Sequence, residues 1–345
     1  MLNIGINGFG RIGRAVLRIN EKNKIFNLVA INDTNPSNEN LAYMLKYDST
    51  YGILDKDIKS DKNTIKIGSS KPIDIYHKEK ICDIPWNNYN VDVIIDASGI
   101  HENLMYKKEL KDKGIKHQIV TNTPDSDEVD KYIIFGVNED TVDSNSFLIS
   151  SSICDASAVA PVLNIINEKY NIEHGFLTTL HPWLSYQNLL DGPSRSFAYP
   201  GTIIENFNLG RASLNAIIPK TTSAIRASAK VLDYLNEKFQ SLSFRVPTSI
   251  VSTADISVKL EKSTDKETII KDFQEKEKYQ RFNVFKNNFE PLISTDFIKS
   301  TYSSIIDHRW TEINKENYLK LVLWYDNEWG YSSRVVDLIS LLKNN

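Results

Sequence analysis

A glycine-rich segment near the N-terminus restricts the fold more than any other part of the chain. Residues 8–13 read Gly-Phe-Gly-Arg-Ile-Gly, follow a strand-like run and open a segment whose apolar residues recur at helical spacing. We expect Gly8 to allow a tight turn, Gly10 to let a ligand approach the backbone, and Gly13 to let helix and strand pack closely. Amide groups at such a helix start attract phosphate groups. The segment therefore predicts the first strand, turn and helix of a dinucleotide-binding fold.

One acidic residue indicates which dinucleotide is bound. Asp33 ends the next predicted strand, 20 positions after Gly13 (33 − 13 = 20). A carboxylate at this place accepts hydrogen bonds from ribose hydroxyls and repels a 2′-phosphate, which favours NAD over NADP. The alternative is a chance glycine turn and an aspartate that caps a strand end. The shared register of strand, glycines, helix and carboxylate favours the nucleotide site.

The N-terminal part of the chain has the pattern of a doubly wound parallel sheet. Helix-like stretches alternate with short β-rich runs at 28–32, 91–96, 118–121, 132–137 and 147–150. Such alternation is typical of α/β proteins in which helices cover a parallel sheet. We therefore assign residues 1–153, completed by a C-terminal helix at 327–345, to a Rossmann NAD-binding domain.

Residues 154–326 show the pattern of an α+β catalytic domain. Apolar and polar residues alternate at 256–260, and strands at 244–246 and 319–324 are expected beside them. This alternation fits a mostly antiparallel sheet with one exposed face. Segments 60–70 and 262–280 are rich in charged and polar residues, so we expect them to be the least ordered, solvated parts of the chain.

Composition limits the partners and the location of the protein. Among 345 residues, 41% are hydrophobic and the net charge is −3, so we expect no nucleic-acid or membrane partner and a small molecule as ligand. No apolar run approaches the ~18 residues that span a bilayer. Two cysteines form no disulfide framework, no signal peptide is evident, and a cytoplasmic protein is expected. We predict no metal site.

Two residues of the second part suggest thiol chemistry. Cys154 follows a strand-like run and begins an amphipathic segment, so its thiol is expected at a helix N-terminus, where a thiolate is favoured. His181 closes another strand-like run and is the candidate base. A thiol and an imidazole together suit aldehyde oxidation, in which thiolate attack and loss of hydride to nicotinamide leave a thioester. Taken alone, a cysteine such as Cys154 is more often a buried structural residue than a nucleophile, and a lone histidine is equally ambiguous.

Four motifs extend the interpretation to the whole chain. Residues 7–14, 45–50, 244–248 and 324–331 read Asn-Gly-Phe-Gly-Arg-Ile-Gly-Arg, Leu-Lys-Tyr-Asp-Ser-Thr, Phe-Arg-Val-Pro-Thr and Trp-Tyr-Asp-Asn-Glu-Trp-Gly-Tyr. In this order they resemble the glyceraldehyde-3-phosphate dehydrogenase family almost end to end. The resemblance implies the family fold, a homotetramer and NAD-dependent oxidation of an aldehyde substrate.

The resemblance also implies roles for single residues. Cys154 corresponds to the nucleophile and His181 to its base, while Asn327 holds the nicotinamide carboxamide and Asp33 the adenosine ribose. The other cofactor contacts that it implies are Gly8, Gly10, Arg11, Ile12, Gly13, Ser98, Gly99, Thr121 and Tyr331.

The residues that flank the nucleophile depart from the family. The family pattern is Ser-Cys-Thr-Thr-Asn-Cys, whereas residues 153–158 read Ile-Cys-Asp-Ala-Ser-Ala, so the hydroxyls that help to bind inorganic phosphate are absent. Asp155 would repel a phosphate dianion at ~4 Å by several kcal/mol at an effective dielectric constant of ~20. We therefore expect an acyl acceptor other than phosphate. Asp155 itself either orients a water as a base or complements the helix dipole.

The predicted anion site is only partly retained. Leu184 and Tyr186 stand where the family has a threonine and an acidic or hydroxyl residue, and Ser223 replaces a glycine. Thr222 and Arg245 remain. Arg245 either holds an anionic ligand bidentately or pairs with an acid of the protein.

One segment is longer than is usual in the family. From His181 to Pro219 the chain has 39 residues (219 − 181 + 1 = 39), and the excess falls around 195–209, a part rich in large apolar residues. In the family this segment lines the cofactor site and a subunit interface. It therefore predicts either a bulkier contact between subunits or a pocket reshaped for a larger substrate.

Three functions follow from these observations. The first is an NAD-dependent aldehyde dehydrogenase whose Cys154 thioester is resolved by water or another non-phosphate nucleophile. The second is ordinary oxidation of glyceraldehyde 3-phosphate or erythrose 4-phosphate with phosphate as acceptor. The third is a catalytically weak paralogue that binds NAD as a sensor or scaffold. Retention of both Cys154 and His181 favours an enzyme.

Overall fold

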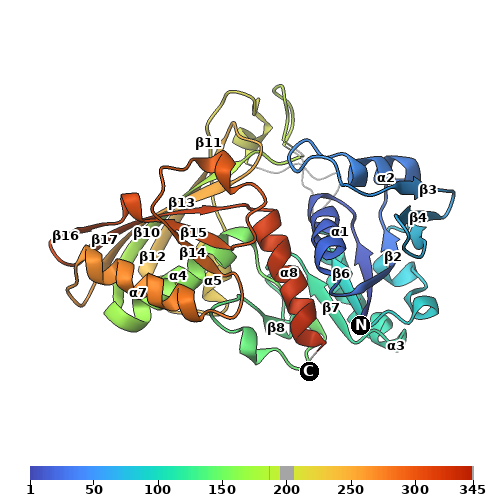
Figure 1. Ribbon diagram of the computed structural model, residues 1–345, viewed down its shortest axis with the longest axis horizontal. Coiled ribbons are helices and arrows are strands. Elements are labelled where there is room, and N and C mark those ends of the chain that lie inside the picture. The colour runs from blue at the N-terminus through green and yellow to red at the C-terminus, as the bar shows by residue number, and fades with distance from the viewer. Residues whose placement is uncertain (186, 195–205, 344–345) are drawn as a thin grey trace. The chain divides into compact units, whose positions relative to one another are not determined.

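The protein divides into two compact units, which are described separately (Figure 1). The computed structural model describes residues 1–185, 187–194 and 206–343. The first unit contains Met1–Ile133, Asp140–Ser151 and the C-terminal segment from Ser332, and the second contains Ile134–Glu139 and Ser152–Tyr331. The predicted domain boundary after residue 153 lies two residues beyond Ser151. Residues 134–139, which the sequence assigned to the nucleotide domain, are part of the second unit.

The first unit is built on a nine-stranded sheet. Its strand order is β3-β4-β5-β2-β1-β6-β7-β9-β8. Pairs from β5 to β8 are parallel, whereas β3, β4 and β5 pair antiparallel. The strands are β1 Asn3–Asn7, β2 Asn27–Asn32, β3 Ile58–Ser60, β4 Thr64–Ile67, β5 Ile73–Tyr76, β6 Val93–Asp96, β7 His117–Val120, β8 Lys131–Tyr132 and β9 Leu148–Ser150.

Burial explains why the central strands are parallel. Every residue of β6, β7 and β9 is buried, so both faces of the sheet are covered there, as is typical of parallel sheets. The covering helices are α1 (Arg11–Asn23), α2 (Asn38–Lys46), α3 (Lys107–Asp112) and most of α8 (Trp329–Leu342). The Rossmann architecture predicted from the alternating pattern is confirmed.

Two details of the first unit differ from the prediction. Segment 60–70 is not a solvated, poorly ordered stretch, because β4 places Ile65 and Ile67 in the core with 0% and 2% exposure. Lys66, which lies between them, is exposed. The predicted strand at 132–137 is wrong beyond Tyr132, where β8 ends and the chain enters the second unit.

The second unit contains an eight-stranded mixed sheet. Its order is β11-β12-β10-β13-β17-β15-β14, with β16 on β17. Only the β10–β12 and β14–β15 pairs are parallel. The strands are β10 Ile172–Pro182, β11 Ile218–Lys220, β12 Phe239–Val246, β13 Ser252–Leu260, β14 Phe285–Asn288, β15 Ser304–Asp307, β16 Glu312–Asn314 and β17 Tyr318–Tyr325. The strands predicted at 244–246, 256–260 and 319–324 are confirmed.

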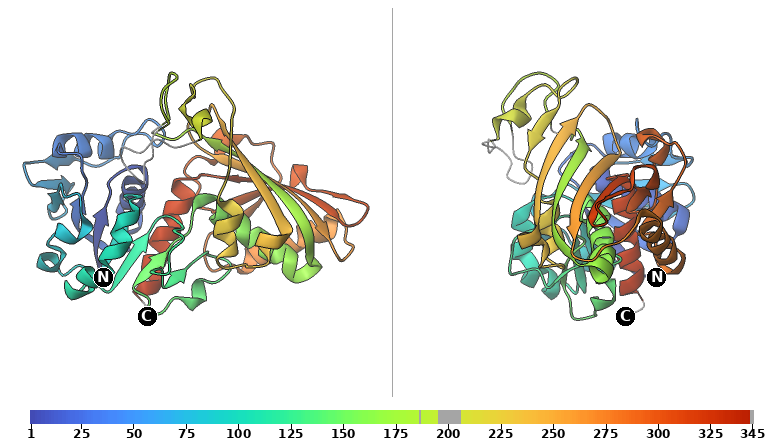
Figure 2. Two further views of the ribbon diagram at one scale, coloured as in Figure 1. Left: turned by 180° about the vertical axis from the view of Figure 1, so that it is seen from behind. Right: turned by 90° about the vertical axis from the view of Figure 1, so that its left-hand side faces the viewer.

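Helix α4 (Cys154–Tyr170) contacts the middle of this sheet. It touches β10, β13, β14, β15 and β17, and residues 155–163 are all buried. Figure 2 shows this helix, coloured green, against the sheet of the second unit. The shorter helices α5 (Ala224–Ala229) and α6 (Leu235–Lys238) follow β11, and α5 also contacts α4. These contacts position Cys154, the first residue of α4, relative to the sheet.

Strand register brings the polar residues of the site together. In the parallel pair of β10 and β12, His181 lies opposite Arg245, and on the other side of β12 Ile218 also lies opposite Arg245. Directly paired residues project from the same face of a sheet. His181, Arg245 and Ile218 therefore share one face at the end of three neighbouring strands.

The segment 262–280 is a helix, which corrects the second prediction of poor order. Helix α7 spans Lys266–Tyr279, and the Asp265 side chain caps its N-terminus by accepting a hydrogen bond from the Thr268 amide. Ile269 and Phe273, four residues apart, are both 0% exposed. The charged residues form the outer face of an amphipathic helix, and this spacing outweighs their number.

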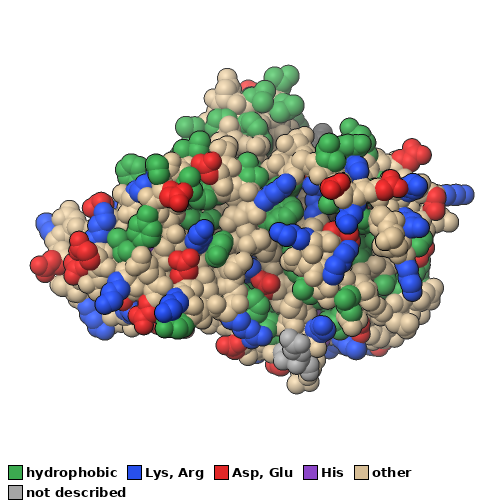
Figure 3. Space-filling view, viewed as in Figure 1, with side chains coloured by type: hydrophobic (Ala, Val, Ile, Leu, Met, Phe, Trp, Pro, Cys, Tyr) green, Lys and Arg blue, Asp and Glu red, His purple; other side chains and the backbone are tan. Residues whose placement is uncertain are grey.

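Charge is distributed evenly over the visible surface. On the face drawn in Figure 3, lysine and arginine side chains are interspersed with aspartate and glutamate, as the net charge of −3 leads one to expect. Among the described residues, no helix has both the length and the apolar character needed to cross a bilayer.

Candidate active site

The thiol of Cys154 lies at the N-terminus of α4, where the sequence predicted it. The preceding Ile153 is extended, and Ser152 has φ +61, a left-handed conformation that non-glycine residues seldom adopt. The Tyr331 hydroxyl donates a hydrogen bond of 3.1 Å to the Ser152 carbonyl oxygen. This tyrosine, predicted as a cofactor contact, therefore supports the turn that presents the thiol.

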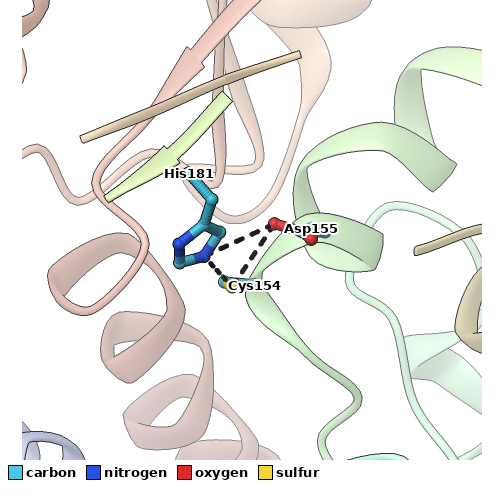
Figure 4. Close-up of side chains that lie close together, drawn as sticks. All are labelled: Cys154, Asp155 and His181. Atoms are coloured by element: carbon cyan, nitrogen blue, oxygen red, sulfur yellow. Dashed lines mark hydrogen bonds and ion pairs between the residues drawn. The ribbon is translucent and has the colours of Figure 1, made fainter. Parts of the chain in front are cut away.

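Three side chains converge at this helix start (Figure 4). His181, at the end of β10, places its Nε2 atom 3.6 Å from Cys154 Sγ. The carboxylate atom Oδ1 of Asp155 lies 3.6 Å from the same sulfur and 3.8 Å from His181 Nε2. His181 is 6% exposed and Asp155 is 7% exposed. The predicted thiol and base are therefore neighbours, and a carboxylate lies beside both.

The Asp155 carboxylate is held by two hydroxyl groups. The Tyr325 hydroxyl donates to Oδ1 at 2.8 Å, and the Thr222 hydroxyl donates to Oδ2 at 3.4 Å. Thr222 Oγ1 also accepts a hydrogen bond of 3.1 Å from the Ala224 amide at the start of α5. Ser223 lies between them and makes no side-chain cap. A threonine predicted to bind an anionic ligand thus binds an anionic residue of the protein.

The other ring nitrogen of His181 has two polar neighbours. Nδ1 lies 3.1 Å from the Pro182 carbonyl oxygen and also contacts Arg245 Nη1, which donates to the same carbonyl at 2.9 Å. In the tautomer that carries its proton on Nδ1, this N–H donates a hydrogen bond to the Pro182 carbonyl oxygen, and the Nε2 lone pair faces the thiol. A guanidinium can only donate, so its contact with Nδ1 suits the tautomer that carries the proton on Nε2. The site has a partner for either tautomer.

Burial disfavours the charged forms of the thiol and the imidazole. It raises the pKa of Cys154 well above the ordinary value, and the Asp155 carboxylate adds to this, whereas Arg245 acts in the opposite direction. Burial also lowers the pKa of His181 to about 4, and Arg245 lowers it further. Desolvation and the neighbouring carboxylate therefore act against the thiolate that the helix N-terminus favours. A neutral imidazole at 3.6 Å can still accept the thiol proton.

The glycine loop of the first unit has the expected local geometry. Gly8 has φ +89, and a Cβ atom there would lie 2.5 Å from the Ser98 amide nitrogen. A Cβ atom on Gly13 would lie 2.3 Å from the Gly8 carbonyl oxygen, so helix and turn pack too closely for a side chain. By contrast, a Cβ atom on Gly10 would meet nothing within 4 Å. The loop is closed behind Gly8 and Gly13 and open in front of Gly10.

Asp33 contacts this loop directly. Its Oδ2 atom accepts a hydrogen bond of 2.7 Å from the Phe9 amide, and Oδ1 accepts one of 2.9 Å from the Asn35 amide. These bonds fix the carboxylate beside the open face at Gly10. The position suits a carboxylate that binds the ribose of a nucleotide whose pyrophosphate lies over Gly10.

The other predicted cofactor residues of this unit have local partners. Ser98 Oγ donates to Asp96 Oδ1 at 2.6 Å, and Thr121 Oγ1 donates to the Asp96 carbonyl oxygen at 3.3 Å. Gly99 has φ +72. Arg11 forms a 2.5 Å ion pair with Asp48 of the motif at 45–50, and the following Ile12 is partly exposed at the start of α1.

Asn327 is the candidate for the nicotinamide amide in the second unit. Its side chain is 9% exposed, and its Oδ1 atom has no hydrogen-bond partner among the described residues. A buried amide oxygen without a partner is costly unless a ligand or water satisfies it. The atom therefore fits a role in binding an amide donor.

Comparison with known proteins identifies the family. The model of the glyceraldehyde 3-phosphate dehydrogenase NAD-binding domain matches residues 2–104, and that of the C-terminal domain matches residues 153–327. A glyceraldehyde-3-phosphate dehydrogenase of Phytophthora infestans is 33% identical over 100% of both chains. Glyceraldehyde-3-phosphate dehydrogenase 3 of Saccharomyces cerevisiae is 36% identical over 98% of both, and the cytosolic enzyme of Sinapis alba is 36% identical over 98% of this chain and 97% of its own.

The chain belongs to the glyceraldehyde-3-phosphate dehydrogenase family. It is therefore an NAD-dependent oxidoreductase that acts on an aldehyde. The family model matched by residues 2–104 is that of an NAD-binding domain, and the open face at Gly10 fits NAD as the cofactor. The resemblance inferred from the four motifs is confirmed.

Part of the predicted departure from the family lies outside the described residues. Tyr186 lies outside the described residues, and so do residues 195–205, which make up most of the longer segment. Leu184 is described and is partly buried, and its amide donates a 2.8 Å hydrogen bond to the Gln187 side chain.

One charged residue near the family's catalytic pair was missed by the sequence interpretation. Lys220 ends β11, is half-buried, and interacts electrostatically with Asp155, Cys154 and Arg245. Burial lowers its pKa, and Arg245 lowers it further. The signal was present in the sequence, because Lys220 is only two residues before Thr222 and directly follows the Ile-Ile-Pro run that marked the end of the longer segment.

Proposed function

We propose that this protein oxidises a small, sugar-derived or phosphorylated aldehyde through a Cys154 thioester, and that the acyl acceptor is not inorganic phosphate. One observation carries the proposal. The Asp155 carboxylate lies 3.6 Å from Cys154 Sγ and accepts the hydroxyl of Thr222, a residue that binds phosphate in the family by resemblance.

The oxidative half of the reaction needs only the thiol and the imidazole. His181 Nε2 accepts the thiol proton while the sulfur bonds to the aldehyde carbon, and returns that proton to the aldehyde oxygen to give a thiohemiacetal. NAD, when bound, takes up the hydride that this carbon loses. His181 removes the hydroxyl proton at the same time, and a thioester on Cys154 remains.

Two features disfavour inorganic phosphate as the acceptor: the negative charge of Asp155, and the hydrogen bond that Thr222 already donates to it. Two unit negative charges ~4 Å apart repel each other by about 4 kcal/mol at an effective dielectric constant of ~20. A phosphate dianion attacking at Cys154 would meet the Asp155 carboxylate at about that distance. Thr222 already donates its hydroxyl to Asp155, so it offers no free donor to phosphate. The remaining cations, Arg245 and Lys220, are instead suited to an anionic group on the substrate.

Water is the acceptor that the cluster suits best. Its oxygen bonds to the acyl carbon, the carbon–sulfur bond breaks, and the product leaves as a carboxylic acid. Asp155 or His181 accepts one proton of the water, and the departing sulfur regains a proton from the site. Asp155 is close enough to both the thiol and the imidazole to serve as this base, at 3.6 Å and 3.8 Å.

The proposal is tested by identifying the product. The purified enzyme is given NAD and a panel of phosphorylated and unphosphorylated sugar aldehydes, with and without inorganic phosphate. We expect NADH formation without phosphate and a free acid by mass spectrometry. A strict phosphate requirement together with an acyl phosphate product would refute the proposal.

The variant Asp155→Thr provides a matched comparison, because it restores the family residue while keeping Cys154 and His181. We expect phosphate to accelerate NADH formation by this variant more than by the unaltered enzyme. An equal response to phosphate in both proteins would show that Asp155 does not control the acceptor.

A second candidate is the ordinary phosphorylating reaction with glyceraldehyde 3-phosphate or erythrose 4-phosphate. The names of the relatives favour it, as do the retained residues Thr222 and Arg245. Turnover of either aldehyde near ~10 s⁻¹ only in the presence of phosphate would establish it.

The cytoplasmic location and the homotetramer remain predictions. The name of the Sinapis alba relative includes the word cytosolic, and the family resemblance implies the tetramer. Light scattering on the purified protein would measure the mass of the assembly directly.

A further inference from the structure

The cluster at the start of α4 contains three different metal-binding groups. A thiol, a carboxylate and an imidazole, from Cys154, Asp155 and His181, offer one ligand atom each, and these atoms all lie within 4.8 Å of one another. The closest separations are 3.6 Å for sulfur to nitrogen, 3.6 Å for sulfur to oxygen and 3.8 Å for nitrogen to oxygen. Figure 4 shows all three side chains pointing toward a common point.

These separations match the edges of a zinc tetrahedron. Zinc binds sulfur at ~2.3 Å and nitrogen or oxygen at ~2.0–2.1 Å with tetrahedral angles, which puts the ligand atoms ~3.3–3.6 Å apart. The observed separations are 3.6, 3.6 and 3.8 Å, so small side-chain shifts bring all three atoms within bonding distance of one ion. A three-ligand set leaves the fourth position for water or substrate.

We infer that Cys154, Asp155 and His181 bind a single Zn²⁺ ion, and that the bound ion holds the enzyme in an inactive state. The inference goes beyond the proposed function and does not depend on the identity of the acyl acceptor. A metal-bound sulfur is not free to attack an aldehyde, and a metal-bound Nε2 cannot accept a proton. Removal of the ion restores both groups.

Neighbouring groups orient the ligands. Tyr325 and Thr222 donate to the two oxygens of Asp155, at 2.8 Å and 3.4 Å, and so fix the carboxylate plane. When Nδ1 of His181 carries the proton, it donates a hydrogen bond to the Pro182 carbonyl oxygen at 3.1 Å, and the Nε2 lone pair is free for a metal. Such contacts around the ligands are typical of zinc sites.

Charge makes Asp155 the decisive ligand. Arg245, Lys220 and the positive end of the α4 dipole all oppose a cation at this place. When the ion binds, the Cys154 thiol loses its proton to solvent, and the resulting thiolate offsets one of the two charges of Zn²⁺. The Asp155 carboxylate offsets the other. Without Asp155, two ligands would have to hold the ion against those opposing charges. The site is therefore a property of this chain's departure at position 155.

Metal binding is measured directly on the full-length protein. The protein is treated with a chelator and a reductant, freed of both, and titrated with Zn²⁺ by calorimetry. It is then titrated with Co²⁺, whose bond to a thiolate gives a charge-transfer absorption band. The unaltered protein and Cys82→Ser, which removes the other thiol, are compared with Asp155→Thr and Asp155→Asn. The asparagine variant keeps the size of the side chain if the threonine variant folds poorly.

We expect one Zn²⁺ per chain in the unaltered protein and in Cys82→Ser, with the charge-transfer band in both. Removing an outer contact of a metal site typically costs 10–100-fold in affinity, so loss of the ligand Asp155 should cost ~100-fold or more. Aldehyde-dependent NADH formation should fall with added Zn²⁺ and return with a chelator. No binding by the unaltered protein, binding lost in Cys82→Ser, or equal affinity in the Asp155 variants would overturn the inference. None of these outcomes alters the product test for the acyl acceptor, which is done with chelator present.

Discussion

The glycine loop and the thiol site differ in the sequence separation of the residues that contact one another. In the loop, Asp33 is bound by the Phe9 amide, 24 residues away, and a more distant neighbour is Ser98, against which Gly8 packs. In the thiol site, Asp155 is bound by Thr222 and by Tyr325, which are 67 and 170 residues away. The loop depends on local spacing, whereas the thiol site depends on the register of a sheet. A single exchange such as Asp155 can therefore alter the chemistry of the second region without disturbing the first.

Loss of the thiol tests whether the second region carries the chemistry. We expect Cys154→Ser to lower aldehyde-dependent NADH formation by about 10³-fold or more, because the covalent route through a thioester is removed. Absorbance at the NADH band measures the rate. The matched control Cys82→Ser removes the other thiol, which lies in the first unit, and should keep normal activity.

The opposite result for this pair would assign the protein to another class. If Cys154→Ser remained as active as the unaltered enzyme, thioester chemistry would be wrong. If the unaltered protein bound NAD but oxidised no aldehyde, and Cys154 resisted alkylation at neutral pH, the sensor or scaffold function would be favoured.

Two glycines of the loop separate stability from cofactor binding. Gly13→Ala places a Cβ atom 2.3 Å from the Gly8 carbonyl oxygen, so we expect a loss of about 3 kcal/mol or more in the free energy of unfolding of the first unit. Gly10→Ala meets no atom within 4 Å and should keep its melting temperature while binding NAD more weakly. Thermal melts and NAD titrations measure both effects. Equal melting temperatures, or unchanged NAD binding in Gly10→Ala, would contradict the assigned geometry.

Acid sensitivity tests the burial of the catalytic imidazole. The folded-state pKa of His181 is about 4, below its ordinary value of 6.5, so protons bind the unfolded chain first as the pH falls. The contribution of the neutral His181 imidazole to the free energy of unfolding is therefore fully present above pH 6.5 and is lost as the pH falls toward 4. At 1.36 kcal/mol per pH unit, about 2 kcal/mol of the loss between pH 7 and pH 5 comes from this residue. Urea denaturation should show that His181→Asn lacks this part of the loss; identical pH dependence would contradict it.

The nucleotide preference is the smallest expected effect. Asp33→Asn keeps an acceptor for the Phe9 amide but removes the charge that repels a 2′-phosphate. We expect the ratio of kcat/KM for NAD to that for NADP to fall by about tenfold, the effect of ~1.4 kcal/mol. Steady-state rates with the two cofactors measure it. An unchanged ratio would mean that other groups of the site select NAD.

The sequence predicted the parts of the molecule that rest on local spacing. The glycine roles, Asp33 at the end of β2, the helix start at Cys154 and the strand ending at His181 all follow from patterns within about 25 residues. The prediction of poor order for segment 262–280 was wrong, because it gave more weight to the number of charged residues than to the spacing of the buried Ile269 and Phe273. A closer count of helical periodicity would have corrected this.

The contacts that tune the thiol site were beyond such patterns. No spacing rule pairs Tyr325 with Asp155 or brings Lys220 near Cys154, because β11, β12 and β10 are adjacent only through the sheet order. The raised pKa of the Cys154 thiol likewise depends on burial by distant segments. For this reason the residues of the site could be named from the sequence, but their charge states could not.

The pairing of His181 with Arg245 across β10 and β12 has a consequence for refolding experiments. Side chains alternate between the two faces of a strand, so a slip of one residue would turn Arg245 away from the imidazole. A one-residue shift between β10 and β12 therefore loses the contact between His181 and Arg245 completely. Recovery of enzyme activity after denaturation therefore reports the moment at which these two strands reach their final alignment. The recovery of helical content, measured by circular dichroism, does not report the alignment of these two strands.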